Sequence, residues 1–295
     1  MPVLDRPLTV LVNPTAGGGR ARAAVAPARA ELERLGVDHR VVETTSARHA
    51  REEAARAAAA GEAIAGVGGD GLIGSLAGEL CGAEVPLVVV PGGRGNDFAR
   101  VLGISTDPAK AVRQAIEGEE RQLDVGECDG RTYVGIASCG FDSEANRIAN
   151  EARLVSGNLV YLYAAIRALV EWRHARFRVT IDGTVHSFTG YSIGVGNSKA
   201  YGGGMYVFPQ SVMDDGLLDA GMGLAISKWR FLGRFKKYFD GSHADDPSIV
   251  YLRGREFEIE SDRPFTVYAD GDPIAELPVH IRVAPGVLRV LVPVR

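Results

Sequence analysis

Short apolar runs alternate with longer amphipathic stretches through about the first 125 residues. The apolar runs predict strands at residues 8–12, 39–43, 63–67, 87–90 and 122–125. The Ala/Arg/Glu-rich stretches predict helices near 20–35, 47–59, 72–80 and 96–117. Gly36 and Gly61 follow two of these helices, where C-cap glycines belong. Strands that alternate with helices indicate a parallel sheet covered on both faces.

The pattern changes after Asp124, where strand candidates follow one another more directly. They are residues 131–137, 176–181, 184–195, 217–223, 255–260, 265–269, 279–283 and 287–292, interrupted by helical stretches at about 142–172 and 227–239. The pairs Asp182-Gly183 and Pro285-Gly286 predict turns between adjacent antiparallel strands.

We therefore predict an α/β domain over residues 1–125, built on a doubly wound parallel sheet, and a mainly antiparallel β-sandwich domain over residues 126–295. The alternative is that the last strand returns to the first domain. No low-complexity linker separates the two domains, so they are expected to pack around a cleft.

The composition narrows the class of protein. A hydrophobic fraction of 46% and a charged fraction of 24% are typical of a soluble globular protein. No uncharged stretch exceeds sixteen residues and the N-terminus shows no signal peptide, so neither a membrane span nor secretion is expected. Three cysteines exclude a fully paired disulfide framework and favour a reducing, cytoplasmic compartment. A net charge of −4 disfavours nucleic acid as a partner.

Glycine is over-represented, with 37 of 295 residues against an average near ~7%. Three glycine-rich segments, residues 13–19, 68–71 and 91–98, each follow a predicted strand and precede a predicted helix. Such loops share the carboxyl edge of a parallel sheet, where helix N-termini offer free N–H groups to phosphate. The three glycine-rich segments therefore predict a phosphate or nucleotide site. The P-loop motif is absent, and the G-x-G-x-x-G pattern of residues 66–71 follows the third strand and not the first, which disfavours a dinucleotide fold.

Three carboxylates fall at this predicted edge. Asp70 lies in the second loop, Asp97 in the third, and Asp124 at the end of the fifth strand. A carboxylate ~4 Å from a phosphate charge costs about 4 kcal/mol at an effective dielectric near 20, and a divalent cation reverses that cost. The three residues therefore predict Mg²⁺-assisted phosphoryl transfer, with helix capping as the alternative for Asp97.

Eight segments of the chain, in this order, resemble the diacylglycerol-kinase-like lipid kinases. That group includes sphingosine and ceramide kinases and is distantly similar to NAD kinases and phosphofructokinases. The resemblance covers essentially the whole chain and is specific for the superfamily but not for the lipid. The segments are residues 12–17, 68–71, 91–93 with 96–100, 123–126, 202–205, 214–219, 241–243 and 270–273.

The resemblance implies ATP as phosphoryl donor and Mg²⁺ as cofactor, with Asp70, Asp97 and Asp124 organising the Mg²⁺–water network. It places the general base on Asp272 of a D-G-D turn, and the alternative from the residues alone is an ordinary hairpin turn. Thr45 is the alternative to Thr44 in the nucleotide site. The residues implied to line ATP are Asn13, Pro14, Thr15, Ala16, Gly17, Thr44, Gly68, Gly69, Asp70, Gly71, Leu72, Ile73, Gly74 and Arg94.

The resemblance also implies a second, structural Mg²⁺ site, formed by the carboxylate of Asp215 and the backbone carbonyls of Val212 and Leu217. From the residues alone, this segment is a turn. The chain departs from the family pattern at Leu72, Gly74 and Arg94, where Thr, Asn and Thr are frequent. Arg94 places a cation in the phosphate loop, which leads to the hypothesis that it contacts ATP.

The predicted function is an ATP-dependent lipid kinase that converts diacylglycerol to phosphatidic acid, with a homodimer possible as in other family members. The alternatives are a kinase of a soluble substrate, as in NAD kinases, and a nucleotide-binding sensor without catalysis. Residues 227–240 interleave basic and aromatic side chains, which suits a peripheral contact with the inner face of the membrane. The alternative is that these aromatics pack on the β domain. Residues 147–178 are a second candidate, for lining the acyl-chain cleft.

Overall fold

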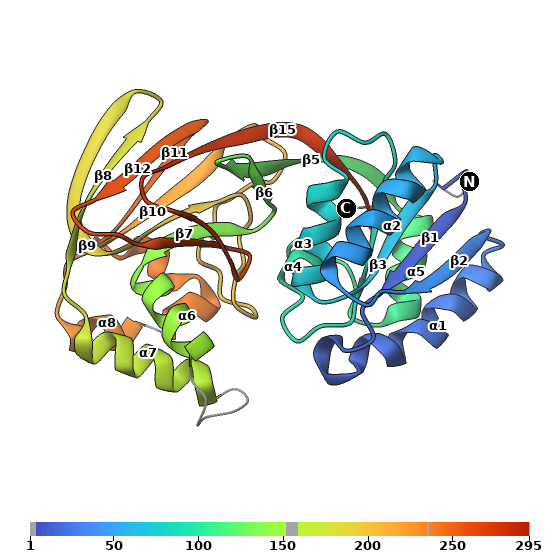
Figure 1. Ribbon diagram of the computed structural model, residues 1–295, viewed down its shortest axis with the longest axis horizontal. Coiled ribbons are helices and arrows are strands. Elements are labelled where there is room, and N and C mark those ends of the chain that lie inside the picture. The colour runs from blue at the N-terminus through green and yellow to red at the C-terminus, as the bar shows by residue number, and fades with distance from the viewer. Residues whose placement is uncertain (1–3, 152–158, 235, 295) are drawn as a thin grey trace.

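The computed structural model describes residues 4–151, 159–234 and 236–294. It has two lobes, which are joined by the long strands β5 (Glu119–Cys128) and β15 (Val279–Val292) (Figure 1). The fifteen strands of the described residues belong to one continuous sheet. None of the described helices is both long enough and apolar enough to cross a membrane.

The first lobe is the predicted α/β unit. Its parallel strands run in the order β4-β3-β1-β2, and every residue of β1, β3 and β4 is buried, as expected for strands covered on both faces. The strands are β1 (Leu8–Val12), β2 (His39–Glu43), β3 (Ala63–Gly68) and β4 (Leu87–Pro91). The helices are α1 (Arg20–Arg34), α2 (Ala47–Ala59), α3 (Asp70–Glu79), α4 (Asp97–Val101) and α5 (Pro108–Ile116).

Two hydrophobic clusters show that this sheet is wound on both faces. One cluster joins the strand residues that point to one face of the sheet to buried side chains of α1 and α5. The other joins the strand residues that point to the opposite face to buried side chains of α2, α3 and α4. The helix expected over residues 96–117 is two helices. Asp107 caps the second through Lys110 N (3.0 Å), and Pro108 follows in its first turn, where proline is tolerated.

The fifth predicted strand does not continue the parallel order. β5 pairs antiparallel with β15 and, through a turn at Asp129 and Gly130, with β6 (Arg131–Tyr133). The place beside β4 is taken by the end of β15, which pairs parallel to it at Val290↔Leu87. β5 and β15 therefore form an antiparallel connection between the lobes.

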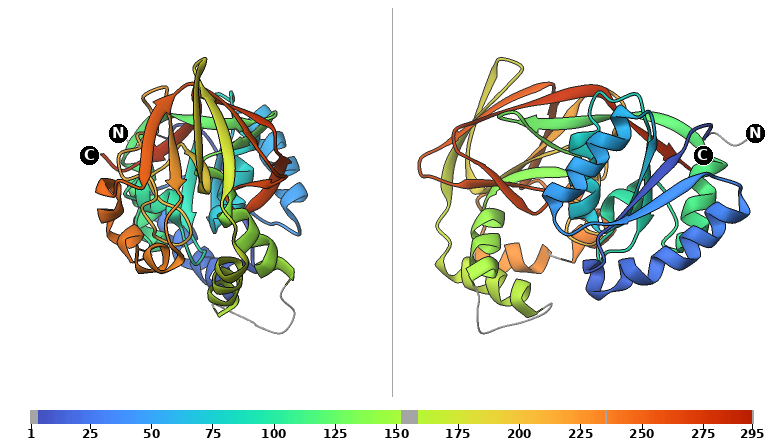
Figure 2. Two further views of the ribbon diagram at one scale, coloured as in Figure 1. Left: turned by 90° about the vertical axis from the view of Figure 1, so that its left-hand side faces the viewer. Right: turned by 45° about the vertical axis from the view of Figure 1, so that its right-hand side comes forward.

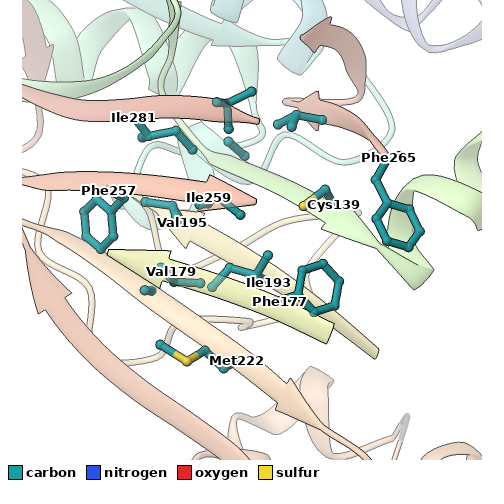
Figure 3. Close-up of a cluster of buried hydrophobic side chains, with 14 of the residues drawn as sticks. Cys139, Phe177, Val179, Ile193, Val195, Met222, Phe257, Ile259, Phe265 and Ile281 are labelled. Atoms are coloured by element: carbon teal, nitrogen blue, oxygen red, sulfur yellow. The ribbon is translucent and has the colours of Figure 1, made fainter. Parts of the chain in front are cut away.

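The second lobe is mainly antiparallel, as predicted. Its strands are β7 (Ile136–Gly140), β8 (Ala175–Ile181), β9 (Thr184–Gly196), β10 (Leu218–Leu224), β11 (Ile249–Gly254), β12 (Glu256–Ser261), β13 (Thr266–Ala269) and β14 (Asp272–Glu276). Its helices are α6 (Phe141–Glu151), α7 (Leu159–Glu171), α8 (Lys228–Arg234) and α9 (Lys237–Asp240). β8 alternates buried and exposed residues, and inward side chains such as Phe177, Phe257 and Met222 fill the core (Figure 3).

The turn predictions have two outcomes. Asp182 and Gly183 form the β8–β9 hairpin, with φ angles of 46° and 82°. Pro285-Gly286 is not a hairpin turn. β15 runs through it with a register shift between Ala284 and Leu288, because a bulge accommodates a proline that cannot donate to the ladder.

The helices of the second lobe lie on one side of the molecule. In Figure 1 and in the turned view of Figure 2, the lower side of the molecule carries α6, α7 and α8 of the second lobe and α1 of the first lobe. The strands β5 and β15 run along the upper side of the molecule. Of the predicted helical stretch at 142–172, residues 152–158 lie outside the described residues.

Candidate active site

The three glycine loops contact one another through their backbones. A Cβ on Gly17 would lie 2.4 Å from the carbonyl oxygen of Gly92, and a Cβ on Gly93 would lie 2.4 Å from the Cα of Gly69. Neither contact is possible for a residue with a side chain, and Gly17 also has a φ of 62°. Glycine therefore allows the loops that follow β1, β3 and β4 to meet at one point of the carboxyl edge.

Asn13 and Thr44 shape the first loop. The Asn13 side-chain oxygen accepts hydrogen bonds from the Thr15 backbone N–H (3.2 Å) and hydroxyl (2.9 Å). Thr44 is buried, and its hydroxyl donates to the Val12 carbonyl (2.9 Å) at the end of β1. Thr45 contacts His49 instead. The structure thus places Thr44, and not Thr45, against the first loop.

Asp70 begins α3 at the bottom of the second loop, and one of its oxygens accepts from the Phe98 N–H (3.3 Å) of the third loop. The side chains of Leu72 and Ile73 are buried in the core beneath α3, so only their backbone can face a ligand. A narrow void, too small to hold a water molecule, lies at this junction. It is lined by Gly68, Gly69, Asp70, Ile73, Val89, Pro91, Asn96, Phe98 and Ala99.

Asn96 and Asp97 connect the third loop to its surroundings. Asn96, at φ 53°, closes the loop by accepting from Gly93 N–H (2.9 Å) and donating to Gly93 O (3.3 Å). Asp97 is buried and accepts from Gly203 N–H (2.7 Å) of the second lobe, so it does not cap its own helix. Its other oxygen, Oδ1, has no hydrogen-bond partner within the described part of the chain. Arg94 is exposed at the rim of this loop.

The second lobe contributes Asp270, which the sequence pattern did not single out as a site residue. Its carboxylate accepts from the N–H groups of Val134 (2.9 Å), Gly135 (2.9 Å) and Ile136 (3.2 Å). One oxygen lies 3.7 Å from where a Cβ on Gly74 would be, so Asp270 faces α3 of the first lobe at Gly74. Burial raises the pKa of Asp270 to about 6, against the effect of the three N–H groups, and the charge of Asp70 adds to the rise.

Asp272 and Asp124 are placed differently from each other. Asp272 begins β14 opposite Ala269 and is exposed, and its carboxylate makes no hydrogen bond to any described residue. Asp124 is buried and accepts from Gly216 N–H (2.7 Å) and Gly286 N–H (2.8 Å). The structure therefore brings Asp70 together with Asp97 and Asp270, and uses Asp124 to hold two backbone segments of the second lobe.

Comparison with known proteins agrees with this architecture. Residues 7–128 match the family described as the diacylglycerol kinase catalytic domain, and residues 135–292 match the YegS C-terminal NAD kinase beta sandwich-like domain. A diacylglycerol kinase from Mycobacterium tuberculosis strain H37Rv is 33% identical over 97% of this chain and 95% of its own. The chain belongs to the diacylglycerol-kinase-like lipid kinases. It is a kinase that acts on an alcohol group.

Two further proteins are similar to this kinase. A "Probable lipid kinase YegS-like" from Pseudomonas aeruginosa PAO1 is 32% identical over 98% of the chain and 95% of its own length. A crystal structure of a diacylglycerol kinase from Bacillus anthracis str. Sterne has a TM-score of 0.74 and 23% identity, covering 98% of this chain and 97% of that one. At that identity it shows that the fold is shared.

The kinase's Asp70 and Asp97 fit a divalent cation. A Cβ on Gly95 would lie 2.8 Å from an Asp70 oxygen and 3.5 Å from an Asp97 oxygen, so the two carboxylates flank the same glycine. Burial raises the pKa of Asp97. Its buried Oδ1 makes no hydrogen bond and has only the Arg100 guanidinium 3.9 Å away, which leaves it free to bind a cation. Among the described residues, however, no three His, Cys, Asp or Glu side chains form a preassembled metal site. A metal here would need ligands from water or from phosphate oxygens.

Proposed function

We propose that this kinase transfers the γ-phosphoryl group of ATP, with Mg²⁺, to the hydroxyl of diacylglycerol and so forms phosphatidic acid. The observation that carries the proposal is the position of Asp70 and Asp97 between glycine loops that can meet only through their backbones. Free N–H groups there suit phosphate oxygens, whereas carboxylates at the same point require a cation. The M. tuberculosis relative, named a diacylglycerol kinase, supports the choice of acceptor.

ATP is proposed to lie along the first three loops, with its triphosphate over the N-terminus of α3 and the third loop. Asn13 to Gly17 and Thr44 would border one side of the nucleotide, and Gly68 to Gly74 would lie beneath it. Arg94, exposed at the rim, is free to reach a phosphate oxygen. When bound, Mg²⁺ neutralises charge on the transferred phosphoryl group, and Asp70 and Asp97 are the side chains that would hold it.

Asp272 is the proposed general base. The acceptor hydroxyl loses its proton to the Asp272 carboxylate, its oxygen bonds to the γ-phosphorus, and ADP leaves. Asp270 is occupied by three backbone N–H groups, so it is suited to fixing the β13–β14 hairpin against β7. Asp272, two residues later and exposed, is accessible to accept a proton.

A lipid panel tests this function. The protein is incubated with radiolabelled ATP and Mg²⁺ in mixed micelles that contain diacylglycerol, sphingosine, ceramide or phosphatidylglycerol, with NAD as the soluble acceptor. We expect labelled phosphatidic acid from diacylglycerol, seen by thin-layer chromatography. Labelled product only from another lipid would correct the acceptor. Label only on NAD would favour the soluble-substrate alternative, and no labelled product would favour a non-catalytic nucleotide sensor.

We also propose that the kinase reaches its substrate from a peripheral position on the membrane, through the helices α7 and α8. Lys228 of α8 donates to the carbonyl of Val170 at the end of α7 (2.6 Å), so the two helices form one surface. Trp229 is 84% exposed and Val170 is 71% exposed. Tyr163, Ile166, Leu232 and Phe239 are also large and exposed on these helices and on α9. Solvated apolar side chains of this size are typical of an interaction surface.

Charge and packing support a bilayer as the partner. Lys228, Arg230, Lys236 and Lys237 are exposed beside the apolar side chains, which suits anionic lipid. Other aromatic and basic side chains of residues 227–240 pack inward. Phe231 stacks on Tyr191 at 4.1 Å, and Arg234 is buried in an ion pair with Asp246 at 2.6 Å. Phe235 lies outside the described residues. A homodimer, implied only by the family, remains a prediction.

Reversing the charge on Lys236 and Lys237 together with Trp229→Ser is expected to weaken binding to vesicles. Each basic residue near an anionic surface contributes about 1 kcal/mol, so two reversals alone predict a loss of about tenfold or more. Co-sedimentation with vesicles of phosphatidylcholine and phosphatidylglycerol measures it. The control is Val185→Ser, an apolar residue on β9 that is 48% exposed, which should bind as the parent does. Unaltered binding of the triple variant would remove this surface from the proposal.

A further inference from the structure

An acidic loop in the second lobe is held by arginines. Residues 214–219 contain three aspartates, and the resemblance described above implied a structural Mg²⁺ bound by Asp215 with the carbonyls of Val212 and Leu217. In the structure, both Asp215 oxygens have protein partners. One accepts from the Leu217 N–H (3.2 Å), and the other forms an ion pair with the guanidinium of Arg253.

Arg253 is held in place by strand pairing. It lies on β11 directly opposite Asp219 of β10 in the antiparallel register, and its Nε is 3.1 Å from an oxygen of Asp219. Asp219 is buried, so its ionised form needs a nearby cation. One guanidinium therefore contacts two carboxylates.

The same loop is tied to β5 by three further contacts. Arg121 of β5 forms an ion pair with Asp214, Asp124 N–H donates to the Met213 carbonyl (2.7 Å), and Gly216 N–H donates to the Asp124 carboxylate (2.7 Å). The position of Asp124 thus depends on the loop that Arg253 fixes. A divalent ion bound to Asp215 would have to displace the guanidinium of Arg253 from one of its oxygens.

We propose that Arg253 takes the place of the structural Mg²⁺, so that the second lobe of this kinase is stable without a second metal and Arg253 acts as a positioning residue for Asp124. The proposal concerns folding of the second lobe. It does not depend on the lipid acceptor, and its tests need no kinase activity.

The first experiment measures metal content and thermal stability of the full chain without nucleotide. After dialysis against EDTA and then against Mg²⁺-containing buffer with a final desalting step, plasma mass spectrometry should find no Mg²⁺ that depends on Asp215. The Tm should be the same in EDTA and in Mg²⁺. If the parent retains Mg²⁺ and Asp215→Asn loses it, or if EDTA lowers the parent Tm by more than about 2 °C while leaving that of Asp215→Asn unchanged, the proposal is wrong.

The second experiment removes the arginine. Arg253→Gln is expected to lower the Tm and to make it depend on Mg²⁺, because Asp215 and Asp219 then lack a cation. Arg253→Lys keeps the charge and should stay independent of Mg²⁺, which covers the case in which the Gln variant does not fold. Arg282→Gln, which breaks a surface ion pair with Glu127, is the matched control and should change little. If Arg253→Gln and the parent have the same Tm when both are measured in EDTA, the proposal is wrong.

Discussion

Asp272→Asn is expected to abolish most kinase turnover while leaving the fold intact. A positioned general base contributes typically about 10²–10⁴-fold to a rate, and asparagine keeps the size of the side chain but cannot take the proton. Because the Asp272 carboxylate bonds to no described residue, its loss should not change the stability. The measurements are kcat and the KM values for ATP and diacylglycerol, with the Tm of each protein. We expect kcat alone to fall.

Two other variants of the β13–β14 hairpin make this result decisive. Glu276→Gln, at the far end of the same strand, removes a carboxylate that accepts from Thr266 (2.7 Å), and it should turn over like the parent. Asp270→Asn replaces one of the two oxygens that accept from three backbone N–H groups with an amide NH₂, so it should lower the Tm as well as the rate. Full turnover by Asp272→Asn, with turnover lost at an unchanged Tm in Asp270→Asn, would transfer the role of base to Asp270.

The first lobe could be predicted well because its signals are local. β1, β3 and β4 are short runs buried on both faces, and the glycine loops follow them directly in the sequence. Each loop's place at the carboxyl edge follows from the alternation of strands and helices. The pattern also found Asp70 and Asp97, whose meeting across Gly95 is a consequence of the same topology.

The largest errors and omissions depend on contacts between distant segments. β5 has the composition of another parallel strand, but its partner β15 lies more than 150 residues away along the chain. Asp270 belongs to a D-G pair that reads as a turn, and only the fold shows its carboxylate against residues 134–136. Arg253 has no motif of its own, because its role follows from the pairing of β10 with β11.

Gly93→Ala is expected to distort the nucleotide site, because the added methyl group would clash with the backbone of Gly69. The added methyl group would lie 2.4 Å from the Cα of Gly69 and 2.9 Å from the side-chain oxygen of Asn96, and the backbone of Gly69 cannot move aside as a flexible side chain could. Overpacking of this kind typically costs about 1–3 kcal/mol. We therefore expect a lower free energy of unfolding in urea and a large rise in the KM for ATP, because the second and third loops are forced apart.

Gly71→Ala separates this steric effect from contact with the nucleotide. Gly71 lies in the first turn of α3, and a Cβ there would meet no atom of the protein within 4 Å, so the fold should be unaffected. If the triphosphate of ATP passes over the N-terminus of α3, the added methyl group will still raise the KM for ATP. An unchanged KM in Gly71→Ala would place the nucleotide elsewhere along the loops. A parent-like Tm and KM in Gly93→Ala would show that the contact between Gly69 and Gly93 does not form the site.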